Sequence, residues 1–172
     1  LTSNGFLLTS GRARMLRTAG LDRITLSLDA VDGAVAARMA GLRGGVGAGD
    51  RLVQQVIDAV TAARSAGFQA GSGAIKLNAV IQRGANDDQL LPLAALARHH
   101  GLDLRLIEFM DVGNRNGWAL EQVMPAAEMV ERIQARWPLQ PMGRDAGATA
   151  RRWRFVDGRG GIGVIASITE PF

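Results

Sequence analysis

The chain has 172 residues, 47% of them hydrophobic and 21% charged, which predicts a globular domain with a sizeable core. It contains no cysteine, which excludes disulfides, thiol catalysis and cysteine-ligated metal within these residues. The net charge is +4, but aromatic residues make up only 5% and no apolar run approaches the ~20 residues of a membrane span, so neither nucleic acid nor a membrane is an expected partner. The two histidines, His99 and His100, are adjacent and cannot face each other on a helix, so a histidine metal site is not expected.

Strands rich in branched apolar residues alternate with helical patterns along most of the chain. The longest helical pattern begins at an aspartate, Asp50, and ends before a glycine, Gly67. In chain order the sequence predicts a helix at 11–19, a strand at 24–28, a helix at 50–66, a strand at 75–81, a helix at 87–100, a strand at 103–109 and a helix at 126–137. Strand–helix–strand repetition indicates an α/β fold with a parallel sheet, either a barrel or a doubly wound sheet.

Two segments rich in small residues are expected to be loops. Residues 41–49 (GLRGGVGAG) resemble a phosphate-binding loop superficially, but no Gly-Lys-Ser/Thr follows, so a flexible loop is expected. Residues 142–150 predict a loop or linker. Strands are then expected at 152–156 and 162–168, and the glycine-containing dipeptides between them predict a short β-hairpin packed on the rest of the chain.

Polar residues recur on one face of the predicted strands, because side chains alternate across a strand. Lys76 and Asn78 share a face of the strand at 75–81, while Ser27 and Arg105 lie on the polar faces of two other strands. Nineteen of the twenty basic residues are arginine, so the single lysine, Lys76, marks a position suited to a compact ammonium group. Lys76 and Arg105 inside a barrel would each need an anionic partner.

The partner of these two cations stays open at this point. An ion pair with Asp29 or Glu108 would be purely structural. A bound phosphate or carboxylate ligand would make the barrel interior a functional site, although Lys76 lies near the start of its strand whereas barrel active sites lie at the carboxyl ends. A desolvated lysine in a barrel strand can also form a Schiff base with a carbonyl substrate.

Several short segments form a recognisable set when they are taken together. The most specific are IKLN at 75–78 and IEFM at 107–110. The others are LTSNG at 1–5, AGLDRITLSLD at 19–29, RGAND at 83–87, GIGVI at 161–165 and PF at 171–172. In this order and spacing the set resembles the radical SAM GTP 3′,8-cyclases of molybdenum-cofactor synthesis. The resemblance implies an incomplete (β/α) radical SAM barrel at 1–140, with 141–172 as a linker and the start of a C-terminal sheet packed on the barrel.

The resemblance also implies an activity and a set of binding residues. Members of the family use two 4Fe–4S clusters and S-adenosylmethionine to convert GTP to (8S)-3′,8-cyclo-7,8-dihydroguanosine 5′-triphosphate. The positions that match S-adenosylmethionine contacts are Ser27 and Met110. The positions assigned to GTP are Thr2 and Lys76, with Asn78 and Arg105 lining the same cavity. A cytoplasmic protein that can form a homodimer is expected.

The cluster-binding cysteines of the family have no counterpart in this sequence. They would precede Thr2 and follow Phe172, so we expect these residues to be part of a longer enzyme, to contain neither metal ligands nor catalytic residues, and to be inactive alone. Three alternatives stay open: another radical SAM enzyme that modifies a cofactor or peptide, a Schiff-base aldolase barrel using Lys76, and a nucleotide-binding or structural module.

Overall fold

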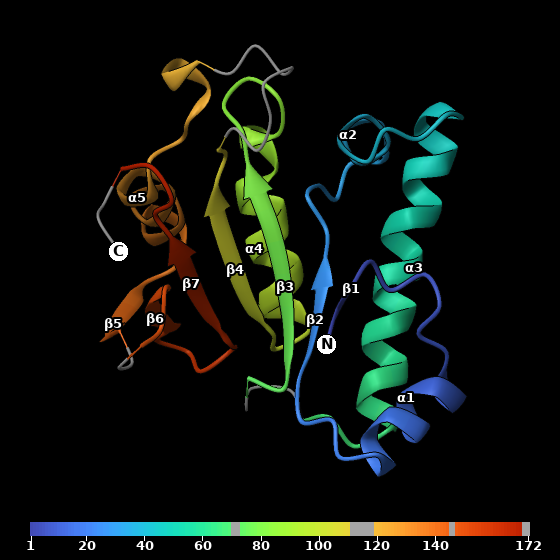
Figure 1. Ribbon diagram of the computed structural model, residues 1–172. Coiled ribbons are helices and arrows are strands. Elements are labelled where there is room, and N and C mark those ends of the chain that lie inside the picture. Colours follow the sequence, from blue (N-terminus) through green and yellow to red (C-terminus); the bar gives the residue numbers. More distant parts are fainter. Residues whose placement is uncertain (70–72, 111–118, 145–146, 170–172) are drawn as a thin grey trace.

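The computed structural model describes residues 1–69, 73–110, 119–144 and 147–169. In these residues seven strands form one sheet in the order β1-β2-β3-β4-β7-β6-β5 (Figure 1). The strands are β1 (Thr2–Ser3), β2 (Ile24–Ser27), β3 (Ile75–Ile81), β4 (Asp103–Glu108), β5 (Leu139–Gly143), β6 (Arg151–Phe155) and β7 (Gly161–Ile165). β1, β2, β3, β4 and β7 are mutually parallel, whereas β6 runs antiparallel to β7 and β5. The predicted α/β class with a parallel sheet is confirmed.

Helices follow the parallel strands, and Figure 1 shows α4 behind β3 and β4. The helices are α1 (Ser10–Thr18), α2 (Gly33–Met39), α3 (Gly45–Ser65), α4 (Leu90–His99) and α5 (Ala126–Arg136), with 3-10 turns at η1 (Asp87–Gln89) and η2 (Leu120–Gln122). Within the described residues, no helix combines the length and hydrophobicity that a bilayer crossing requires.

The core lies between the sheet and its helices. β3 and β4 alternate strictly between buried and half-buried positions, as expected for strands with one face against helices. The buried residues of these two strands are Ile75, Leu77, Ala79, Ile81, Leu104, Leu106 and Glu108. The other face of the same strands is therefore left to carry polar side chains.

The long helix α3 begins at Gly45, inside the segment predicted to be a loop, rather than at Asp50. The reason is contact with α2, which the sequence analysis did not predict. A Cβ added at Gly49 would stand 1.7 Å from the carbonyl oxygen of Gly33 in α2, so the two helix backbones touch at this point. Glycine disfavours a helix by about 1 kcal/mol relative to alanine, but here it permits a close approach that buries both helices.

The C-terminal strands are more extensive than the sequence analysis indicated. β6 and β7 pair antiparallel, and β7 also pairs with β4 in parallel, so it lies between them. β5 reaches Gly143, within the segment predicted to be a loop from residue 142. Pro141 disfavours a strand, but β5 is at the edge of the sheet, where proline is tolerated.

Candidate functional site

Strand register places five of the six predicted binding residues on the sheet face opposite the helices. Paired residues on neighbouring strands point to the same side of a sheet. One row across the sheet is Thr2, Thr25 and Lys76, and the adjacent row is Ser27, Asn78 and Arg105. The polar face inferred from alternation is therefore continuous from β1 to β4.

The sixth predicted residue, Met110, lies beyond the carboxyl end of β4. The residue is 40% exposed, so a ligand could reach it. Lys76, in contrast, is the second residue of β3 and lies at the opposite, amino-terminal end of the strands. Met110, a predicted S-adenosylmethionine contact, and Lys76, a predicted GTP contact, are thus at different ends of the parallel strands.

A cavity of about 750 Å³ is open at the amino-terminal ends of β3, β4 and β7. Of the six predicted residues, Lys76 and Arg105 line it. Asn78 is two residues after Lys76 in β3 and is the register partner of Arg105. We call this space the cationic cavity, because the described charged side chains that line it are Arg23, Lys76, Asp103, Arg105, Arg152 and Arg154.

The electrostatics of the cationic cavity are dominated by positive charge. The pKa of the Lys76 ammonium is lowered, first by burial and then by the neighbouring charge of Arg105. Asp103, its register partner on β4, raises this pKa, whereas Arg152 and Arg23 lower it further. An anion in the cavity would relieve this repulsion, because an opposite charge favours the protonated form of a lysine.

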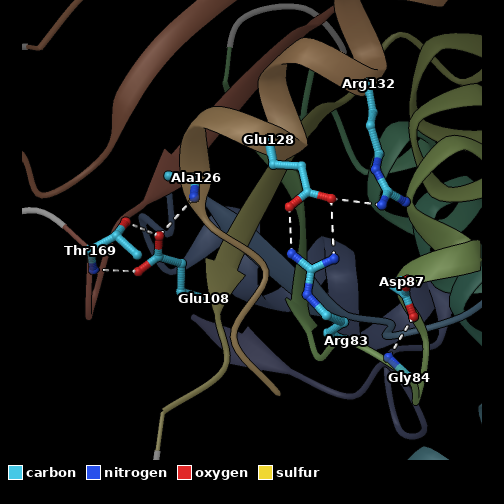
Figure 2. A network of polar contacts seen from close by, with 8 residues as sticks. All are labelled: Arg83, Gly84, Asp87, Glu108, Ala126, Glu128, Arg132 and Thr169. Carbon is cyan, nitrogen blue, oxygen red and sulfur yellow. Dashed lines mark hydrogen bonds and ion pairs between the residues drawn. The ribbon is translucent and has the colours of Figure 1, made fainter. Parts of the chain in front are cut away.

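Glu108 is not the partner of the cavity cations. Its side chain points to the helix side of the sheet and is fully buried. The carboxylate accepts the N–H of Ala126 at 2.7 Å and of Thr169 at 3.0 Å, and it also accepts the Thr169 hydroxyl (Figure 2). It further accepts the N–H of Ile168 at 2.8 Å. The structural alternative in which Glu108 forms an ion pair with Lys76 is therefore wrong.

Asp29, the other carboxylate considered as a partner of Lys76 and Arg105, instead forms a hydrogen bond with the main chain. It accepts the main-chain N–H of Val80 at 2.8 Å, and burial raises its pKa while this hydrogen bond partly offsets the shift. Among the described residues, the ion pairs include neither Lys76 nor Arg105. Within the part of the chain that the structure describes, the two cations therefore face the cavity without forming an ion pair with a carboxylate.

Asn78 has an unusual polar atom. Its side-chain oxygen Oδ1 is buried and accepts no hydrogen bond from the described residues. Leaving a buried acceptor unpaired costs roughly 1–3 kcal/mol, so a hydroxyl or amino group of a ligand that donated to it would be favoured. Its register partner Ser27 is exposed and offers a hydroxyl on the same face.

Sequence reasoning missed three arginines of the cationic cavity. Arg152 and Arg154 come from β6, and Arg23 immediately precedes β2. The alternation in the RRWRF segment indicates that Arg152 and Arg154 share a face. Which strand they would lie beside could not be read from the sequence, because it depends on the non-local insertion of β7 next to β4.

Another cavity, of about 590 Å³, lies between α5 and the C-terminal strands. Its walls are mainly apolar and include Val130, Val164 and Ala166. None of the predicted binding residues lines it, so it has no part in the candidate site.

These features define an α/β protein whose parallel sheet carries a cationic cavity on one face. The family model "Molybdenum Cofactor Synthesis C" matches residues 102–172. The GTP 3′,8-cyclase of Synechococcus sp. (strain CC9605) is 69% identical over 172 residues, which is all of this chain and 50% of that protein. The GTP 3′,8-cyclases of Acidothermus cellulolyticus and Xanthomonas axonopodis pv. citri are 49% and 46% identical over 173 aligned residues, covering all of this chain and 44% and 48% of those proteins.

The chain thus spans about half the length of the curated relatives it matches. The resemblance inferred from its motifs is confirmed, because the chain is similar to GTP 3′,8-cyclases over its full length.

Proposed function

We propose that this chain is part of a GTP 3′,8-cyclase of molybdenum-cofactor biosynthesis. The observation that carries the proposal is 69% identity to a protein of that name along the whole chain. The reaction is the conversion of GTP to (8S)-3′,8-cyclo-7,8-dihydroguanosine 5′-triphosphate by S-adenosylmethionine radical chemistry, in a cytoplasmic enzyme that can form a homodimer. Similarity to these cyclases over the whole chain favours the reaction over the Schiff-base aldolase alternative for Lys76.

The polar sheet face would bind the substrate in this proposal. Lys76 and Arg105 would hold phosphate oxygens, because both face the cationic cavity and charge-assisted hydrogen bonds to phosphate are strong. Asn78 would accept a donor of the ligand at its unpaired Oδ1. Thr2, in the same row as Lys76, would add a hydroxyl contact to GTP.

Ser27 and Met110 are proposed to contact S-adenosylmethionine. Both are accessible and lie towards the carboxyl ends of β2 and β4, where ligands of parallel α/β folds bind. The separation of Met110 from Lys76 would place the two bound molecules along the strand direction. The division into a partial barrel at 1–140 and a C-terminal segment at 141–172 stays part of the proposal, although β5 crosses that boundary and the described strands of both parts share one sheet.

The residues present do not fit the iron–sulfur clusters themselves. The sequence has no cysteine, and the described residues contain no group of histidine, aspartate or glutamate that could hold a metal ion. The two 4Fe–4S clusters would therefore take their ligands from outside these residues, and we assign no step of the reaction to the clusters here. The chain alone is expected to be inactive.

The proposal is tested on the protein encoded by the complete gene that contains this sequence. The purified, anaerobically reconstituted enzyme is expected to form the cyclised triphosphate from GTP and S-adenosylmethionine, as measured by chromatography. Lys76→Gln should lower kcat/KM for GTP at least tenfold, since one charge-assisted contact contributes about 1.5–3 kcal/mol. Arg51→Gln, which removes an exposed arginine of α3 away from the cavity, is the matched control. A complete enzyme that binds its clusters but leaves GTP unchanged would contradict the proposal.

A further inference from the structure

The insertion of β7 between β4 and β6 creates a trough on the polar face of the sheet. Arg105 of β4 pairs with Gly163 of β7, and Gly163 pairs with Arg152 of β6. In the adjacent row, Asp103 of β4 and Arg154 of β6 are both paired with Gly161. In both rows, β4 and β6 therefore each contribute a charged side chain, whereas the glycine of β7 between them contributes none.

The two glycines make the floor of this trough out of main chain. A Cβ added at Gly161 would stand 2.8 Å from the carbonyl oxygen of Trp153 and 3.2 Å from the Oδ1 of Asp103. A Cβ added at Gly163 would fall 3.6 Å from the Cβ of Ala150, which is ordinary contact. A larger side chain at either position would fill the space between β4 and β6 that the cationic cavity now occupies.

Positive charges outnumber negative ones among the described residues around the trough. Five basic side chains and one carboxylate, Asp103, are the charged groups among the described residues that line the cavity. Three of the basic groups, Arg105, Arg152 and Arg23, each disfavour the charged form of Lys76. Cations gathered in this way repel one another, and the arrangement becomes favourable when a ligand with several negative charges lies among them.

A nucleic acid is a poor candidate for that ligand. Single-stranded nucleic acids are bound by aromatic stacking along a basic groove, and the cavity offers Trp153 as its one aromatic residue in the described lining. A single phosphate group could contact one wall of the trough. A chain of phosphate groups could contact both walls across the glycine floor.

We propose that Arg152 and Arg154 of β6 bind the phosphate chain of the nucleotide from the side opposite Lys76 and Arg105, and so select an oligophosphate over a monophosphate. The inference rests on the proposed function for the nature of the ligand and adds residues that the family motifs do not assign. Guanidinium groups suit this role because they can donate two parallel hydrogen bonds to one phosphate. β6 is then a specificity-determining strand.

The test titrates the protein encoded by the complete gene with inorganic tripolyphosphate, pyrophosphate and phosphate by isothermal calorimetry. Tripolyphosphate is expected to bind at least tenfold more tightly than phosphate. Arg152→Gln and Arg154→Gln should each weaken tripolyphosphate binding about three- to tenfold and change phosphate binding less, and they should flatten the dependence of Kd on salt. Arg51→Gln is the control for a general loss of charge and should leave the tripolyphosphate Kd within twofold of its original value.

Two further results separate this inference from the proposed function. If Lys76→Gln weakens tripolyphosphate binding while both β6 variants leave it within twofold, the inference is overturned and the proposed function stands. In the complete enzyme, Arg152→Gln should raise KM for GTP with little change in kcat; an unchanged KM would also overturn the role of β6. Tripolyphosphate binding does not need the clusters, so it reports on β6 even if the complete enzyme proves not to act on GTP. An unchanged midpoint of thermal unfolding in each variant shows that the fold is retained.

Discussion

Glu108 and Thr169 are 61 residues apart in the chain, yet the carboxylate of Glu108 accepts both the main-chain N–H and the hydroxyl of Thr169 (Figure 2). The same carboxylate accepts the N–H of Ala126 at the start of α5, where Pro125 provides no side-chain cap. One buried anion therefore connects the end of β4, the start of a helix and the segment that follows β7. The N-terminal end of a helix favours a negative charge, which explains how a carboxylate is tolerated there.

Replacing this carboxylate should be costly. Glu108→Gln keeps the shape but removes the charge and one acceptor oxygen, so we expect the free energy of unfolding to fall by roughly 2–4 kcal/mol. Urea denaturation followed by circular dichroism measures the change. Glu131→Gln, an exposed glutamate of α5, is the control and should alter stability by about 0.5 kcal/mol or less. Equal effects of the two substitutions would show that the Glu108 contacts contribute little.

The carboxylate of Glu128 in α5 should make the free energy of unfolding depend on pH. Glu128 accepts hydrogen bonds from Arg83 and, at 2.6 Å, from Arg132 (Figure 2). Hydrogen bonding to Arg83, followed by that to Arg132, lowers the pKa of Glu128, although partial burial opposes the shift. The charged form is thus favoured in the folded state.

The contribution of Glu128 should therefore be complete above the unfolded pKa of about 4.3 and disappear as the pH falls through the lowered folded pKa. Glu128→Gln is expected to be less stable by about 0.5–1 kcal/mol at pH 7 and equally stable near pH 2. Unfolding midpoints in urea across this range test the expectation. A difference that persisted at the acid end would assign the effect to packing rather than to charge.

Lys76 should reduce the stability of the ligand-free protein. Its pKa is lowered by burial and by Arg105, so the charged ammonium is less favourable in the folded than in the unfolded state. This penalty is present below the lowered folded pKa and is lost as the pH rises towards the unfolded value of about 10.4. Lys76→Met should raise the free energy of unfolding slightly at pH 7, by roughly 0.5 kcal/mol or less, and the gain should vanish at high pH. Lower stability of Lys76→Met at pH 7 would mean that the ammonium is compensated within the protein.

The helix contact at Gly49 offers a sharp comparison within one helix. Gly49→Ala would drive a methyl group into the Gly33 carbonyl and should destabilise the fold by about 1–3 kcal/mol. At Gly47 of the same helix, the nearest atom to an added Cβ is the end of the Arg51 side chain at 3.7 Å. Gly47→Ala should therefore stabilise the protein by up to about 1 kcal/mol through helix propensity. Thermal unfolding of both variants decides whether backbone contact or propensity controls this segment.

Local patterns predicted the parallel strands well, because a strand that is buried on one face has apolar residues at alternate positions. β3 was predicted with the bounds that it has, and its polar face, with Lys76 and Asn78, was predicted before any strand neighbours were known. Motif resemblance pointed to the GTP 3′,8-cyclases, to which the chain is similar over its full length, whereas composition and periodicity alone could not do so.

The elements that were missed depend on partners distant in sequence. The start of α3 could not be predicted from a run of glycines, because the compensating contact with Gly33 lies on another helix. The role of Glu108 was misjudged because its donors come from α5 and from the residues after β7. Arg152 belongs to the cationic cavity only because β7, rather than β6, lies beside β4.

The position of β7 also sets an order on the folding of a nascent chain. β4 and β6 are both complete in the sequence before Gly161–Ile165 has been synthesised, but neither can be joined to the other without that strand. During translation, the edge of β4 that pairs with β7 therefore stays unpaired until residue 165 has left the ribosome. Unpaired strand edges are prone to pair with other chains. Of the described strands, the last to be made is thus the one that joins β4 to β6, and truncation before it would leave two separate sheets, one parallel and one antiparallel.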